Sequence, residues 1–142
     1  INPAVMRWLI AAAIIRPMAT TGRGDPLRLG RTLRYANRAQ RRALVIRDGG
    51  CIFPGCTRPP AWCDAHHPDT FEHGGATDIE NLALLCRHHH RLTHRPRWAM
   101  ERWHHPDEPA AVLFRWTTPF GNTLYSQRHQ TRIDPPPQAS AA

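Results

Sequence analysis

The feature that most constrains the fold is a dense group of cysteines and histidines in the middle of the chain. All four cysteines lie between Cys51 and Cys86, and seven of the ten histidines lie between His66 and His94. A chain of 142 residues, 14 of them proline, can bury only a modest hydrophobic core. Because a bound metal can supply folding energy that a small core lacks, the sequence predicts a metal-stabilised fold.

Two pairs of potential ligands have the spacing of a tetrahedral zinc site. Cys51 and Cys56 flank a Pro-Gly pair, which favours a tight turn that brings their sulfurs together. Cys86 and His89 are separated by two residues and provide the second pair. We predict a structural zinc ion on these four residues. Cys63 is an alternative ligand or a buried thiol, and disulfide bonds are a further alternative.

Composition limits the compartment and the partners of the protein. No stretch reaches the roughly 18 apolar residues that a membrane span needs, and no secretion signal is recognised. We therefore expect a cytoplasmic protein with reduced thiols and no membrane partner. The net charge is +8, and every basic residue is an arginine. This favours a nucleic-acid partner, with double-stranded DNA as the expected form, although a coding bias toward arginine explains the composition equally well.

Three other metal motifs fail on specific residues. His90 and His94 have the helical spacing of a metalloprotease pair, but Arg91 stands where the general-base glutamate is needed. A finger of two cysteines followed by His67 and His73 requires a helix that the intervening prolines forbid. A zinc deaminase needs a His-x-Glu ahead of a Pro-Cys-x-x-Cys, and neither motif is present.

Capping and alternation patterns predict the elements on either side of the cysteine and histidine group. Asn2 can cap an apolar N-terminal helix, and residues 27–33 suggest a short strand. Asn37 and Gln40 have the spacing of a capping box, which predicts a helix through about Arg47. Residues 97–103 and 111–126 alternate as in a β-hairpin or meander, and the proline-rich end beyond Ile133 is expected to be disordered.

Two sets of arginines are candidates for nucleic-acid binding. The first set lies opposite the helix face shared by Ala39, Ala43 and Ile46, and consists of Arg38, Arg41 and Arg42. The second recurs every four residues in the last part of the histidine group, and consists of Arg87, Arg91 and Arg95. Phosphate contact and a solvated charged face are both compatible with each set.

The order of the remaining residues resembles the HNH endonuclease family. His66 and His67 are adjacent, Asn81 follows 14 positions after His67, and His90 and His94 complete the order. With the four cysteines and a Gly-Gly pair between the histidines, the stretch resembles the zinc-containing branch of the family. It resembles in particular bacterial proteins that place an uncharacterised domain ahead of a C-terminal HNH module. The resemblance extends more weakly over residues 30–98.

The resemblance implies an α+β fold, namely a small zinc-stapled ββα-metal finger with N-terminal helices and a C-terminal β-hairpin. It also implies that His66, with His90 and His94, ligates a catalytic divalent ion (Mg, Mn, Ni or Zn), and that His67 is the general base. Asn81 would fix the loop behind His67. Because a strand alternates its faces, we expect His66 and His67 to point to opposite sides.

Four regions and one activity follow from these interpretations. Residues 1–36 would be the end of a preceding domain, 37–97 the HNH module, 98–133 a β-hairpin extension and 134–142 a disordered tail. The implied activity is metal-dependent hydrolysis of DNA phosphodiester bonds. A non-catalytic zinc-dependent DNA-binding module is the alternative. Asp64 is a candidate partner of His66, whereas His73 and His88 are expected at the surface.

Overall fold

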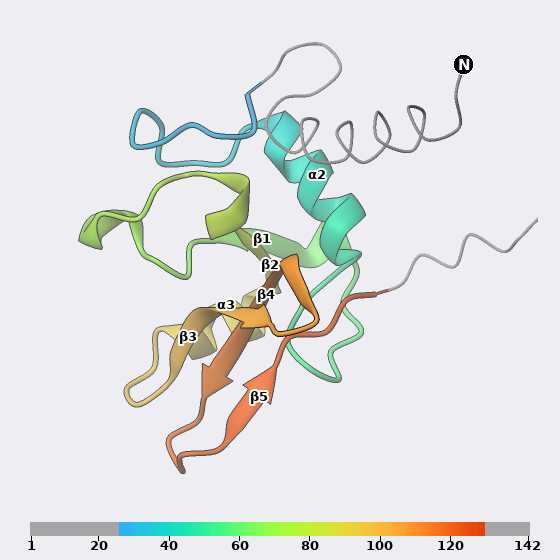
Figure 1. Cartoon of the computed structure of the whole chain (residues 1–142), viewed down its shortest axis with the longest axis vertical. Coiled ribbons are helices and arrows are strands. Elements are labelled where there is room, and N and C mark those ends of the chain that lie inside the picture. The colour runs from blue at the N-terminus through green and yellow to red at the C-terminus, as the bar shows by residue number, and fades with distance from the viewer. Residues whose placement is uncertain (1–25, 130–142) are drawn as a thin grey trace, which may run out of the picture.

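The computed structural model describes residues 26–129, so the predicted N-terminal helix and disordered tail lie outside the described residues. Two helices and two antiparallel sheets make up the fold (Figure 1). The helices are α2 (Arg38–Asp48) and α3 (Arg87–Thr93). The first sheet pairs β1 (Cys63–His66) with β2 (Ala83–Cys86). The second has the order β3 (Ala99–His105), β4 (Glu108–Thr117) and β5 (Thr123–Tyr125). The predicted mixed fold is confirmed, with β1, β2 and α3 as its ββα unit.

Helix α2 begins at the predicted capping box. The side chain of Asn37 accepts a hydrogen bond from the Gln40 backbone N–H (2.7 Å), and the Gln40 side chain accepts one from the Asn37 N–H (2.9 Å). The helix ends at Gly49, which adopts the left-handed φ of 68° that favours glycine. Its buried residues include Leu44, whereas Ile46 is 79% exposed. The apolar face therefore differs from the predicted one, because Leu44 and not Ile46 points into the core.

A buried ion pair joins α2 to the first sheet. The Arg47 guanidinium contacts the Asp48 carboxylate at 2.7 Å, and both side chains are almost fully buried. Arg47 also donates to the backbone oxygens of Ile79 (2.8 Å) and Leu82 (2.6 Å), while Asp48 accepts from the Leu84 N–H (3.0 Å). Every charged atom thus has a partner, which is the condition under which a buried pair is tolerated.

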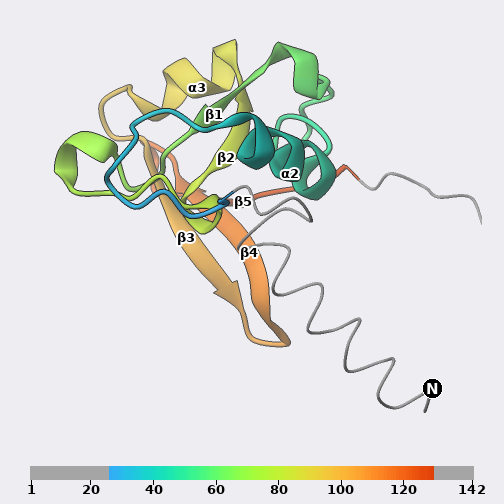
Figure 2. The ribbon, with the colours of Figure 1, turned by 90° about the horizontal axis from the view of Figure 1, so that it is seen from above.

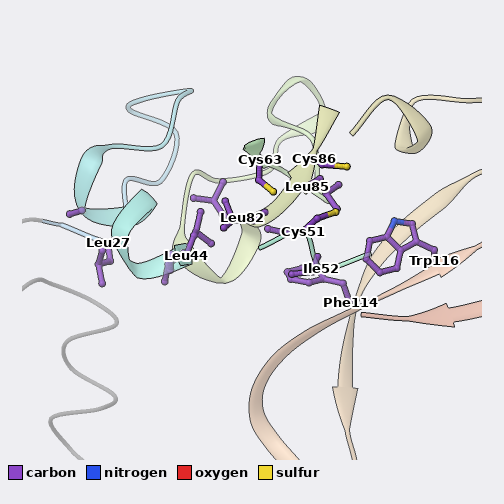
Figure 3. Close-up of a cluster of buried hydrophobic side chains, with 14 residues drawn as sticks. Leu27, Leu44, Cys51, Ile52, Cys63, Leu82, Leu85, Cys86, Phe114 and Trp116 are labelled. Atoms are coloured by element: carbon purple, nitrogen blue, oxygen red, sulfur yellow. The ribbon is translucent and has the colours of Figure 1, made fainter. Parts of the chain in front are cut away.

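The hydrophobic core is continuous across both sheets. Figure 3 shows it running from Leu27 and Leu44 beside α2, through Ile52, to Phe114 and Trp116 of the second sheet. Figure 2 shows the β3–β4 hairpin projecting away from α2 and α3. The second sheet is therefore packed on the ββα unit at one end only. The three strands confirm the predicted meander, with Gly121 at φ 81° in the turn before β5.

The strand predicted over residues 27–33 is wrong. The segment instead makes one isolated bridge, between Arg28 and Asp78, and then a turn at Gly30, whose φ is 54°. Leu29 and Gly30 exchange backbone hydrogen bonds with Thr77 at 3.1 and 2.7 Å. The turn ends the extended chain after a single bridged residue pair. Within residues 26–129 no helix has the length and apolarity to cross a membrane.

Candidate metal centres and active site

The four predicted zinc ligands converge at one point, and we call them the cysteine–histidine cluster. Cys51 and Cys56 lie on the loop after α2, Cys86 ends β2 and His89 lies in α3. Their donor atoms all lie within 4.8 Å of one another. Cys56 Sγ is 3.9 Å from Cys86 Sγ, and His89 Nδ1 is 3.3 Å from Cys86 Sγ and 3.5 Å from Cys51 Sγ. With Zn–S near 2.3 Å, the edge between two sulfurs of a tetrahedral site is about 3.8 Å, so the cluster could hold zinc.

Burial of the cluster disfavours charged thiolates unless a cation is bound. The Cys51 thiol is fully buried, and desolvation raises its pKa well above the ordinary range. A nearby divalent cation would offset this penalty and favour the thiolate, because metal ligation requires deprotonated sulfur. The donor set, its spacing and its burial therefore all fit zinc.

Two features outside the ligands hold the cluster in shape. The ring of Phe53 stacks on His89 with centroids 3.9 Å apart and an interplanar angle of 8°. Phe53 also meets Trp116 of β4 edge-on at 5.3 Å. The second sheet therefore supports the orientation of the histidine ligand. Sequence reasoning missed this role of β4, because no local pattern links residue 53 to residue 116.

The second feature is the segment 126–129, which we call the C-terminal strap. Gln127 donates from Nε2 to the backbone oxygens of Cys51 (3.2 Å) and Cys56 (2.7 Å), and accepts from the Gly55 N–H (2.9 Å). His129 Nε2 lies 2.9 Å from the same Cys51 oxygen. The strap therefore holds the loop that carries Cys51 and Cys56 by hydrogen bonds to its backbone. Its polar residues gave no signal in the sequence, because they sit beyond the last strand.

Cys63 lies outside the cluster, although it is buried. Its thiol is 3.3 Å from the Pro59 oxygen, and burial raises its pKa to about 11. All four cysteines are free thiols, so the disulfide alternative does not hold. Cys63 behaves as the buried thiol that the sequence left open.

A second group, the triple-histidine cluster, consists of His66, His90 and His94. Their donor nitrogens lie within 4.8 Å of one another, and their ring centroids are 5.0 to 5.6 Å apart. His66 ends β1 and is 5% exposed, whereas His94 is exposed at the C-cap of α3. Burial, reinforced by the neighbouring imidazoles, lowers the pKa of His66 to about 3 and keeps it neutral. Neutral imidazoles at this spacing could ligate one divalent ion.

His67 lies beside this cluster and shares its cavity. Both His66 and His67 line an open cavity of about 290 Å³, together with His90 and His94. The two side chains have separate partners: the His66 ring contacts His90 and His94, whereas His67 contacts Phe71 and Thr77. That they face opposite sides stays a prediction. Burial lowers the pKa of His67 below its ordinary value, which keeps its imidazole neutral near pH 7.

Asn81 fixes the loop that follows His67. Its side chain accepts from the Asp69 N–H (3.1 Å) and donates to the oxygens of Asp69 and Ala76 (2.9 Å each). The loop is tightly closed, since a Cβ on Gly75 would lie 1.7 Å from the Asp69 oxygen. These contacts match the loop-fixing position expected for Asn81. A larger cavity of about 740 Å³ also borders this loop, but it contains no residue of either ligand cluster.

Asp64, Arg41 and Arg95 differ from the predictions in their contacts or positions. Asp64 was expected to contact His66. Its Oδ2 instead lies 3.6 Å from Nδ1 of His90. Arg41 donates to the backbone oxygens of Pro60 and Cys63 and is therefore occupied within the fold. Arg95 follows the end of α3 and does not share the helix. The exposed members of the two arginine sets are Arg38, Arg42, Arg87, Arg91 and Arg95.

Comparisons with known proteins agree with this geometry. Residues 51–95 match the family model described as HNH endonuclease, which confirms the predicted resemblance over this segment and indicates a nuclease or nucleic-acid-binding function. The uncharacterized protein Rv1128c of Mycobacterium tuberculosis is 38% identical over 90 residues, 63% of this chain and 20% of the relative. The uncharacterized protein Rv3776 of the same organism is 38% identical over 88 residues, 62% and 16% of the two chains.

The uncharacterized protein Mb1179c of Mycobacterium bovis is 37% identical over 82 residues, 58% of this chain and 18% of the relative. The chain thus spans about a fifth or less of the length of these curated relatives. No solved structure matches the chain.

Proposed function

We propose that the HNH segment is a metal-dependent endonuclease that hydrolyses phosphodiester bonds of DNA. The observation that carries this proposal is the shared cavity, in which His67 stands beside three histidines whose donor nitrogens lie within 4.8 Å of one another. A general base and a divalent-ion site within one cavity are together sufficient components for metal-assisted phosphodiester hydrolysis. The cysteine–histidine cluster would hold a separate, structural zinc.

Each residue of the cavity has a distinct proposed role. His66, His90 and His94 would hold the divalent ion, which when bound supplies Lewis-acid stabilisation of the charge that develops on the phosphate. His67 would accept the proton of the attacking water at its free ring nitrogen. Asn81 would keep the loop after His67 closed and so maintain the position of the base.

Exposed arginines of α2 and α3 would hold the DNA backbone. Arg87 and Arg91 lie on α3 next to the proposed ligands, and Arg38 and Arg42 lie exposed on α2. Arginine contacts to phosphate give affinity without sequence specificity. Such contacts fit a nucleic-acid backbone, for which we propose double-stranded DNA, and they predict binding that weakens steeply with salt.

The competing function is a zinc-dependent DNA-binding module without catalysis. It accounts for the cysteine–histidine cluster and for the net charge. It leaves the triple-histidine cluster without a purpose, and it gives His67 no reason to share that cavity. Cleavage separates the two functions directly, because a binding module has no hydrolytic activity.

The test is plasmid cleavage by the full chain with Mg²⁺, Mn²⁺, Ni²⁺ or Zn²⁺, with bound zinc measured on the same protein. We expect His67→Ala to reduce cleavage by about 100-fold or more, while zinc content, melting temperature and DNA affinity stay near wild type. His104→Ala is the matched control, because this exposed histidine of β3 lies outside both clusters. Cleavage by His67→Ala at the wild-type rate would contradict the role of His67. DNA binding by the wild type without cleavage, with every metal, would favour the binding module.

A further inference from the structure

We propose that Thr77 is a positioning residue that fixes His67 as the tautomer protonated on Nε2, with Nδ1 left as the free base. His67 Nε2 lies 3.0 Å from Thr77 Oγ1, and Thr77 Oγ1 lies 3.2 Å from the backbone oxygen of Arg34. The three groups form a short relay behind the imidazole. The consequence for cleavage rests on the proposed nuclease function, whereas the tautomer itself does not.

The direction of the relay follows from counting protons. The Arg34 carbonyl can only accept a hydrogen bond, so the single hydroxyl proton of Thr77 is directed to it. The Thr77 oxygen must then accept from His67, which requires a proton on Nε2. A neutral imidazole carries one N–H, and Nδ1 therefore keeps its lone pair.

Thr77 is well suited to this task because its own position is fixed on every side. The residue has no exposed surface. Its backbone N–H donates to the Gly30 oxygen (2.7 Å), and its backbone oxygen accepts from the Leu29 N–H (3.1 Å) and from Gln40 Nε2 (2.7 Å). Gln40 is the same residue that closes the capping box of α2. The start of α2 therefore sets the place of the hydroxyl group that holds His67.

The relay would also keep the imidazole in place during proton transfer. When His67 takes up a proton on Nδ1, the bond from Nε2–H to Thr77 is retained, so the ring need not turn. An imidazole without the relay would exchange between tautomers and orientations, and only part of the population would present its lone pair to the cavity. Partners that orient metal-ligating histidines change metal affinity or activity by about 10- to 100-fold when removed, and we expect an effect of similar size here.

The decisive experiment is nitrogen NMR on the zinc-loaded full chain with ¹⁵N-labelled histidine, which distinguishes the two imidazole tautomers by the shifts of their ring nitrogens. The His67 signals are identified by their loss in His67→Ala. We expect wild-type His67 to be protonated on Nε2. Thr77→Val, which replaces the hydroxyl with a methyl group of similar size, should shift His67 toward a mixture, and Thr77→Ser should restore the wild-type signal.

Cleavage supplies the second readout. Thr77→Val should lower kcat by about 10-fold or more with little change in KM, and Thr77→Ser should recover most of that loss. Wild-type His67 protonated on Nδ1 would overturn the relay whatever Thr77→Val does. An unchanged tautomer in folded, zinc-loaded Thr77→Val would overturn it too. The expected tautomer in a wild-type protein that cleaves nothing would refute the nuclease proposal and leave the relay standing.

Discussion

The two ligand clusters share helix α3 but differ in how they meet solvent. The cysteine–histidine cluster contains the buried Cys51 and Cys86 and is closed by Phe53 and the C-terminal strap. The triple-histidine cluster borders an open cavity, and His94 is exposed. Closed sites with a full set of protein ligands are typical of structural zinc, whereas open sites leave room for water and substrate. Under the proposed function, the closed cluster would stabilise the fold and the open cluster would hold the ion used in cleavage.

The adjacency of His89 and His90 connects the clusters. His89 belongs to the closed cluster and His90 to the open one, although they are neighbours in α3. A metal ion on the first would therefore orient the helix that presents ligands to the second. Breaking the closed cluster should abolish both sites, and breaking the open cluster should abolish only one.

The largest expected effect is that of Cys86→Ser. Because zinc binding in small domains contributes on the order of 10 kcal/mol to folding, the variant should lose zinc and its cooperative melting transition. Zinc analysis and circular dichroism measure this. Cys63→Ser is the control and should retain zinc with a loss of about 1 kcal/mol, because that thiol bonds only to backbone oxygen. Retained zinc in Cys86→Ser would remove this residue from the ligand set.

His66→Ala should separate the two clusters. We expect the variant to keep its structural zinc and its fold, and to need an exchangeable metal concentration about 10- to 100-fold higher for half-maximal cleavage. Metal titration of plasmid cleavage, with zinc content measured in parallel, provides the test. An unaltered metal requirement would mean that the open cluster does not bind the ion used in cleavage.

Gln127→Ala tests whether closure of the first cluster depends on the strap. The variant loses three hydrogen bonds to the cysteine loop. The expected destabilisation is about 1–3 kcal/mol, with faster loss of zinc to a chelator. Thr123→Ala, an exposed change on the neighbouring β5, should leave both quantities nearly unaltered. Equal rates of zinc loss in the two variants would show that the strap is not needed for closure.

The smallest expected effect distinguishes two neighbouring arginines. Arg42→Ala should weaken DNA binding and reduce the slope of log affinity against log salt by about 1, because one phosphate contact is lost. Arg41→Ala should leave the slope unaltered and lower the free energy of unfolding by about 1–2 kcal/mol, because this side chain bonds to backbone oxygens. Identical slopes for wild type and Arg42→Ala would remove Arg42 from the DNA-binding surface.

Sequence reasoning succeeded where the signal was local. The capping box of Asn37 and Gln40, the paired ligands Cys51 and Cys56, and the alternation of the meander are all contained in short windows. Their chemistry needs no knowledge of distant contacts. Helical spacing also places His90 and His94 about one turn apart, whereas their role as metal ligands is what the resemblance to the HNH family implies.

It failed where position depends on contacts between distant segments. The role of Thr77 was missed, because its partners Arg34 and His67 lie 43 and 10 positions away. The strand predicted over residues 27–33 does not form, because the chain turns at Gly30, whose oxygen accepts from the Thr77 N–H. Ile46 was assigned to the wrong face because helical periodicity alone does not say which side meets the core.

The strap has a consequence for the order in which the protein can assemble. Gln127 and His129 reach the Cys51 oxygen across 76 and 78 positions of sequence, while the four ligands span only residues 51–89. A ribosome delivers the ligands long before the strap, and contacts of such high sequence separation form late. The nascent chain could therefore capture zinc in a site that still exchanges it readily. Full retention of the metal would begin only once the last strand and the strap have emerged and folded.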